Sequence, residues 1–100
     1  MGSKCIMLSK KSASLIAQLH AKNALLGLNM AVTVETPFNK IAGKTETRVM
    51  IDIGERNIHQ AETEIYKFLL THAHREPKYI DPVKLKEYVK IPKNNIYRRL

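Results

Sequence analysis

The sequence has few of the residues that build disulfide frameworks, phosphate loops or membrane spans. Its 100 residues include one cysteine, four glycines, four prolines and no tryptophan. The single cysteine, Cys5, excludes an intramolecular disulfide and favours a reducing compartment, so we expect a cytoplasmic protein. Four glycines argue against a glycine-rich phosphate loop. No apolar run approaches the roughly 18 residues of a membrane span, so we expect no association with a membrane.

Acidic residues are also scarce. Nine Asp and Glu residues stand against 17 Lys and Arg residues, which gives a formal net charge of +8. Residues 1–34 carry four lysines and no acid, residues 35–76 carry six basic and seven acidic residues, and residues 77–100 carry seven basic and two acidic residues. The excess therefore lies toward both ends of the sequence. A basic balance of this size favours polyanionic partners, nucleic acid above all.

The chain has the size and composition of one small domain. Hydrophobic residues make up 44% of it, and a domain commonly takes about 100 to 200 residues. We find no internal repeat and no low-complexity segment. We therefore expect a single domain over 1–100, with a core over 1–76 and a basic tail over 77–100.

The first half predicts one helix and two strands. Apolar residues at helical spacing predict a helix over 9–26, which Gly27 ends. Residues 4–8 are compatible with a short strand or with an apolar entry to the helix. Alternating apolar and polar residues over 30–36 and 46–53 then predict an antiparallel hairpin.

The connection between these two strands is long for a hairpin loop, where about two to five residues are usual. It spans residues 37–45 and carries Lys40 and Lys44 close to Phe38. Long loops often carry function. We interpret this loop either as a nucleic-acid contact or as a solvated surface turn.

A long helix is predicted over 57–75. Asn57 and Gln60 have the spacing of a capping box at its start. Apolar residues then recur along one stripe, and Pro77 ends the pattern. We expect this helix to pack on the sheet.

The tail resembles the helix-turn-helix motif of DNA-binding proteins. Asp81 and Pro82 are typical of a helix start. Four apolar residues then stand at the four spacings that the motif requires inward, and the chain closes on a Tyr-Arg-Arg-Leu sequence common in recognition helices. These apolar residues are Leu85, Val89, Ile91 and Ile96.

The resemblance implies a short recognition helix at the end of the chain. Arg and Lys donate to guanine, Asn pairs with adenine, and further cations neutralise phosphate. Lys86 and Lys90 depart from the motif, which has a small residue and a glycine there. A helical hairpin that caps the core and a protein-docking helix are the alternatives. Residues implied for the major groove are Lys93, Asn94, Asn95, Tyr97 and Arg98, and those implied for phosphate are Lys90 and Arg99.

Metal and catalytic chemistry find little support. His72 and His74 are two residues apart, so on a helix they point in nearly opposite directions, whereas helical ligand pairs are three or four apart. Cys5 has no sequence context that marks a nucleophile. We expect no metal, no cofactor and no enzymatic activity.

These observations predict an α+β protein with an N-terminal helix, an antiparallel β-hairpin, a long amphipathic helix and a short C-terminal helix-turn-helix-like pair. The predicted function is that of a small basic protein that binds double-stranded DNA in a sequence-dependent way and regulates transcription or a mobile element. Alternatives are a module that binds an acidic protein partner and a sequence-independent RNA-binding protein. A homodimer is a natural hypothesis because twofold pairing doubles the footprint on DNA. The first helix or an open edge of the hairpin would supply its interface.

Overall fold

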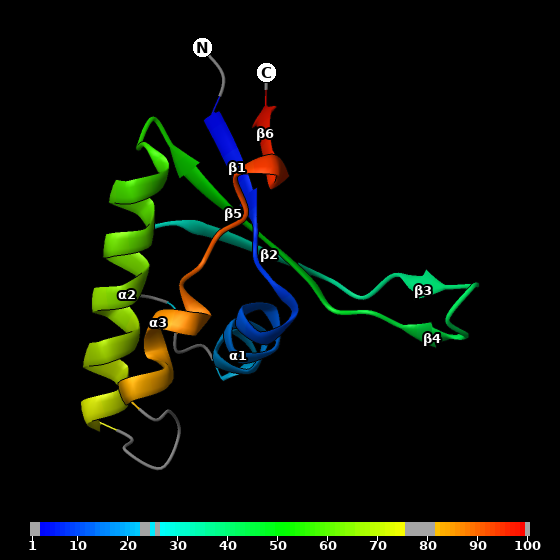
Figure 1. Ribbon diagram of the computed structural model, residues 1–100, viewed down its shortest axis with the longest axis horizontal. Coiled ribbons are helices and arrows are strands. Elements are labelled where there is room, and N and C mark those ends of the chain that lie inside the picture. The colour runs from blue at the N-terminus through cyan, green and yellow to red at the C-terminus, as the bar shows by residue number, and fades with distance from the viewer. Residues whose placement is uncertain (1–2, 23–24, 26, 76–81, 100) are drawn as a thin grey trace.

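A four-stranded antiparallel sheet organises the protein. The computed structural model describes residues 3–22, 25, 27–75 and 82–99 (Figure 1). The strand order is β2-β5-β1-β6. The strands of this sheet are β1 (Ser3–Met7), β2 (Ala31–Glu35), β5 (Arg48–Gly54) and β6 (Ile96–Arg99).

Helices connect the strands. In the sequence, a second, small sheet is inserted after β2 and before β5. The helices are α1 (Lys10–Ala21), α2 (Ile58–Arg75) and α3 (Leu85–Tyr88), with 3-10 turns η1 (Pro82–Lys84) and η2 (Lys93–Asn95). The small sheet pairs β3 (Phe38–Asn39) with β4 (Lys44–Thr45). Within the described ranges, no helix combines the length and the apolar character needed to cross a membrane.

The N-terminal and C-terminal strands lie side by side (Figure 1). Ile6 of β1 stands opposite Ile51 of β5 on one side and Ile96 of β6 on the other. Without the inserted β3–β4 hairpin and α3, the order of strands and helices is that of the split βαβ, or ferredoxin-like, arrangement. This topology places β1 in the middle of the sheet, although it begins the chain.

Alternation along β5 separates two faces of the sheet. Val49, Ile51 and Ile53 have no exposed surface and join the core with residues of α1, α2 and α3. Their neighbours Met50 and Asp52 are half-buried and lie outside that core. Successive strand residues point to opposite faces, so the helices and the core belong to one face only.

The predicted C-terminal helix pair is wrong, and with it the predicted architecture, although the α+β class agrees with the structure. Residues 93–95 form a 3-10 turn, and residues 96–99 form the edge strand β6. Leu85, Val89 and Ile91 are buried in the common core instead of packing one helix of a motif on another. The physical reason is long-range: β1 has a second edge of backbone donors and acceptors, and β6 satisfies it.

The first helix is shorter than predicted. It ends at Ala21 and not at residue 26, and Lys22 is its C-cap. Leu25 and Leu28 follow the helix, lie in turns and are buried. Asn29 then adopts a left-handed φ of 55° before β2. Leu25 and Leu28 thus reach the core without being part of the helix.

The capping box predicted at Asn57 and Gln60 is confirmed. The Gln60 amide donates to Asn57 Oδ1 at 2.8 Å, and the Asn57 amide donates to Gln60 Oε1 at 3.1 Å. The two side chains thereby satisfy two amides that the first helical turn leaves without helix partners. Asp81, predicted to cap the following helix, lies outside the described residues.

Candidate nucleic-acid interface

The β3–β4 hairpin extends away from the rest of the protein (Figure 1). It occupies the long connection between β2 and β5. Phe38 stands opposite Thr45, and Asn39 stands opposite Lys44. The Glu46 amide donates to the carbonyl of Pro37 at 2.9 Å and closes the base of this ribbon. The expected surface loop is therefore an ordered two-stranded arm.

Asn39 fixes the turn at the end of the arm. Its Oδ1 accepts hydrogen bonds from the amides of Ile41 and Ala42, both at 3.0 Å, and its Nδ2 donates to Glu46 Oε1 at 2.9 Å. Gly43 has a left-handed φ of 68°, and its amide donates to the Asn39 carbonyl at 2.8 Å. An Asx turn of this kind orders a short loop without help from the core.

The turn presents an apolar side chain between two cations. Ile41 is 100% exposed, and Phe38, on the arm below it, is 62% exposed. Lys40 and Lys44 flank the tip and are both exposed. Most large apolar side chains are at least partly buried. The arm therefore displays apolar surface and positive charge together, at the point farthest from the sheet.

Further cations lie at the base of the arm. The Leu8 amide donates to the Val49 carbonyl at 3.2 Å, which brings the start of α1 next to the start of β5. Arg48 is exposed there, as are Lys10 and Lys11 in the first turn of α1. That turn contains no acidic residue, so the lysine charges add to the positive end of the helix dipole.

The acidic residues near the arm are set back from its tip. Glu46 is half-buried and accepts the hydrogen bond from Asn39, and Glu35 stands opposite Arg48 at the base. Lys11 forms an ion pair with Glu87 at 3.6 Å, but both side chains are largely exposed, so the pair is weak. Lys40 and Lys44 therefore set the charge of the tip.

The predicted site residues divide into two groups that the structure does not bring together. Lys40 and Lys44 share the hairpin, whereas the residues of the tail lie on η2 and β6, near the two chain ends (Figure 1). Lys90 follows α3 and is exposed. In the turn η2, Asn94 is exposed and Asn95 is half-buried.

Strand β6 cannot present its side chains as a recognition helix would. Tyr97 and Arg98 are both exposed, but as neighbours on a strand they point to opposite faces. The Tyr97 hydroxyl donates to the sulfur of Met7. Lys93 and Arg99 lie in η2 and β6, and the placement of their side chains is outside the described part. The described tail residues therefore do not form the recognition helix expected from the sequence.

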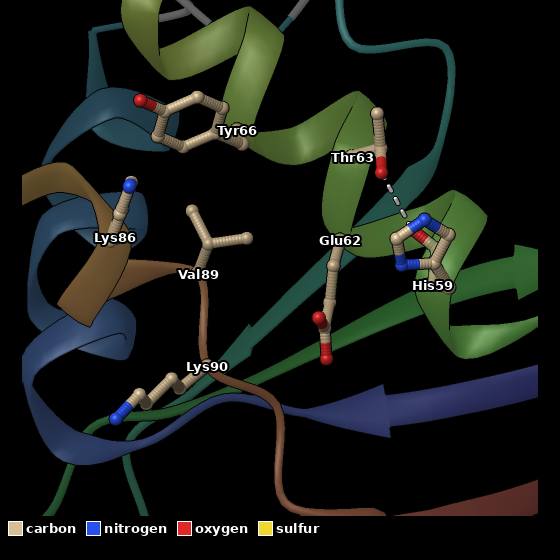
Figure 2. A pocket seen from close by; sticks show the side chains of 7 residues that line it. All are labelled: His59, Glu62, Thr63, Tyr66, Lys86, Val89 and Lys90. Atoms are coloured by element: carbon tan, nitrogen blue, oxygen red, sulfur yellow. Dashed lines mark hydrogen bonds between the residues drawn. The ribbon is translucent and has the colours of Figure 1, made fainter.

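A groove of about 410 Å³ lies between α2 and α3 (Figure 2). Lys86 points toward the side where Tyr66 lies, while Glu62 extends into the open space below Val89 (Figure 2). The hydroxyl of Thr63 donates to the carbonyl of His59 at 2.9 Å, so the helix backbone already uses it. The groove presents both signs of charge, and we assign it no ligand. Its lining residues are His59, Glu62, Thr63, Tyr66, Lys86, Val89 and Lys90.

Neither a metal site among the described residues nor a similar protein indicates another function. Among the described residues, no group of three or more His, Cys, Asp and Glu side chains is placed to hold a metal ion. The sequence matches no family model and no curated protein, and the structure matches no solved structure.

The sequence indicated part of this candidate interface and left part of it unrecognised. Lys40 and Lys44 were predicted from the length and charge of the loop. Ile41 was missed, although it lies between the two lysines, because nothing local distinguishes a tip residue from a buried one. Lys10 and Lys11 were missed because only the pairing of β1 with β5 brings them to the hairpin base.

Proposed function

We propose that the protein binds double-stranded DNA through the β3–β4 hairpin. The observation that carries the proposal is the fully exposed Ile41 at the tip of an ordered ribbon, with Lys40 and Lys44 exposed on either side. A two-stranded ribbon fits the major groove of B-DNA. Apolar side chains such as Ile also serve as wedges between base steps in the minor groove. In both modes the lysines neutralise phosphates.

The same geometry favours DNA over duplex RNA. The major groove of A-form RNA is too deep and narrow for side chains to read, and its minor groove is wide and shallow. A narrow arm with a small apolar tip gains less contact there. We therefore place DNA ahead of RNA as the partner.

The arm offers few groups that read bases. Asn39 is the residue of the arm best suited to pair with adenine, but its side chain already forms hydrogen bonds with the turn amides and with Glu46. Most of the binding energy then comes from phosphates and from the shape of the groove. We propose that the protein binds DNA with low sequence selectivity. This binding would serve the regulation of transcription or of a mobile element that the sequence predicts.

The test compares two double variants of equal charge. Lys40→Ala/Lys44→Ala removes the two cations of the tip, and Lys67→Ala/Lys86→Ala removes two exposed lysines from α2 and α3, across the molecule from the arm (Figure 1). Binding to a labelled 20-base-pair duplex is measured by fluorescence anisotropy over a salt series. Duplex RNA and heparin are measured in parallel.

We expect the hairpin variant to lower DNA affinity at least tenfold at low salt and to reduce the slope of log K against log salt by about two. The control variant should change both much less. Equal losses in the two variants would mean that overall charge, and not the hairpin, governs binding. Absence of duplex binding by the wild type at low salt would overturn the proposal and leave an acidic protein as the partner to seek.

The wedge is tested separately. Ile41→Ala removes the apolar tip and no charge, and Val83→Ala makes the same kind of change at a residue that is 84% exposed beside α3. We expect Ile41→Ala to lower affinity and to reduce DNA bending, measured by energy transfer between dyes at the two duplex ends. Val83→Ala should match the wild type. Unchanged affinity and bending in Ile41→Ala would mean that only the lysines of the arm, and not its apolar tip, contribute to DNA binding.

A further inference from the structure

One edge of the main sheet is unpaired among the described residues, and its strand β2 contains no cation. β2 pairs with β5 along one side, and no described strand pairs with its other side. An exposed strand edge is a row of backbone donors and acceptors ready to pair with another strand. Folded proteins commonly protect such edges with lysine, proline or a bulge.

β2 lacks these protective features. Its sequence, Ala-Val-Thr-Val-Glu, contains no lysine, arginine or proline, and its register with β5 has no irregularity. The opposite edge, β6, differs: Arg98 is exposed there, and its cross-strand partner is Lys4. In a chain with a net charge of +8, β2 is the edge where two copies meet with the least repulsion.

We propose that β2 pairs with β2 of a second copy, antiparallel and centred on Thr33, to form a continuous eight-stranded sheet. In this register Thr33 faces Thr33 of the second copy, Val32 faces Val34, and Ala31 faces Glu35. No like charges stand directly opposite each other, and β-branched residues pair with β-branched residues, which favours strand pairing. The strand is therefore complementary to itself.

Burial supports the same pairing. Val32 and Val34 point to the core face but are only half-buried, and both pack against the edge of the hydrophobic core. A second copy would cover them with the same two valines and extend the core across the interface. Thr33 and Glu35, on the other face, are exposed and need no further burial.

The pairing has a consequence for the hairpins. The twofold axis is perpendicular to the sheet at Thr33, so the helices of both copies lie on one side. Each hairpin follows the C-terminal end of β2, so the two arms lie at opposite ends of the paired strands. Their attachment points at the two Glu35 residues are about 14 Å apart along the strands, at roughly 3.4 Å per residue. Engagement of one duplex by both arms rests on the proposed function, whereas the dimer itself does not.

The experiment is sedimentation equilibrium of the full chain without DNA, from about 1 to 200 μM. Thr33→Lys places like charges directly opposite each other across the proposed twofold axis. Ala31→Lys adds the same charge to the same strand but faces Glu35 of the second copy. Both sites are exposed in the single chain, so both variants are expected to fold.

We expect the wild type to reach twice its mass of 11.4 kDa. Thr33→Lys should raise the dissociation constant of the dimer at least about fivefold at low salt, and Ala31→Lys should leave it unchanged or lower it. A wild type that stays monomeric at 200 μM overturns the inference. So does an equal effect of the two lysines, or no effect of Thr33→Lys.

A second measurement covers the case in which Thr33→Lys does not fold. Amide hydrogen exchange over residues 31–35 of the wild type should slow as protein concentration rises, and exchange in β6 should not. Concentration-independent exchange in β2 would also overturn the inference. Because neither measurement includes DNA, loss of the dimer and loss of DNA binding are recorded independently.

Discussion

The hydroxyl of Ser12 donates a hydrogen bond to the backbone carbonyl of Tyr88 and so joins α1 to α3. Ser12 has no exposed surface, and it is the one polar residue in the buried set of the described chain. It also accepts a hydrogen bond from the Ser9 hydroxyl at 3.1 Å. This contact helps to hold α3 and the following segment in the position from which β6 reaches β1.

Replacement of Ser12 by alanine should destabilise the protein. The change removes this donor from the Tyr88 carbonyl in a partly buried contact, and the loss of the hydrogen bond outweighs the gain in helix propensity. We expect Ser12→Ala to lower the free energy of unfolding by about 1–2 kcal/mol in urea denaturation. Ser14→Ala, an exposed site on the same helix, should stay within about 0.5 kcal/mol of the wild type. Equal stability of the two variants would contradict this role.

Leu85 should behave as a residue of the common core that α3 shares with α1, α2 and β5. It has no exposed surface, whereas Val83, two residues earlier, is 84% exposed. We expect Leu85→Ala to cost about 2–5 kcal/mol through lost burial and the cavity left behind, with Val83→Ala near neutral. Thermal and urea unfolding measure both. A small effect at Leu85 would show that α3 does not pack as described.

Gly54 should resist substitution for a conformational reason. It ends β5 with a left-handed φ of 63°, and an added Cβ would meet nothing closer than the flexible side chain of Arg56 at 3.8 Å. We expect Gly54→Ala to cost about 1–2 kcal/mol and Gly54→Asn less, because Asn adopts this region more readily. Gly27→Ala, where φ is not positive and Phe68 is 3.7 Å away, should be neutral or slightly stabilising. A reversed order of the two alanine variants in urea denaturation would contradict the described turn.

Asn39 should support DNA binding without touching the core. Asn39→Ala removes the acceptor of the Ile41 and Ala42 amides and the donor to Glu46. We expect faster amide exchange at the tip and DNA affinity lowered about threefold to tenfold, because an arm that is no longer ordered must pay ordering entropy on binding. The melting temperature should change little.

The matched control for that variant is Asn94→Ala. Asn94 is exposed in η2, and a recognition helix would have placed it in the major groove. We expect its loss to leave DNA affinity unchanged. A larger loss at Asn94 than at Asn39 would return the contact surface to the C-terminal tail.

Local chemistry was readable from the sequence. The Asn57 and Gln60 capping box depends on residues three apart, so its hydrogen bonds follow from the chain itself. Lys40 and Lys44 were identified as candidates because loop length and charge are also local properties. The sequence could not place Ile41 at a protruding tip, because exposure depends on where the rest of the chain lies.

Only the tertiary structure determined the secondary structure of the tail. By local spacing, Leu85, Val89, Ile91 and Ile96 suit a pair of short helices, and the departures at Lys86 and Lys90 do not by themselves indicate a strand. The structure instead uses three of them in the core and turns residues 96–99 into a strand, because β1, some 90 residues earlier, requires a partner for its free edge. Backbone hydrogen bonds between distant strands leave only a weak trace in either strand's sequence, since any residue that tolerates an extended backbone can form them. The sequence by itself determined charge, class and caps, and long-range pairing determined which surface those charges occupy.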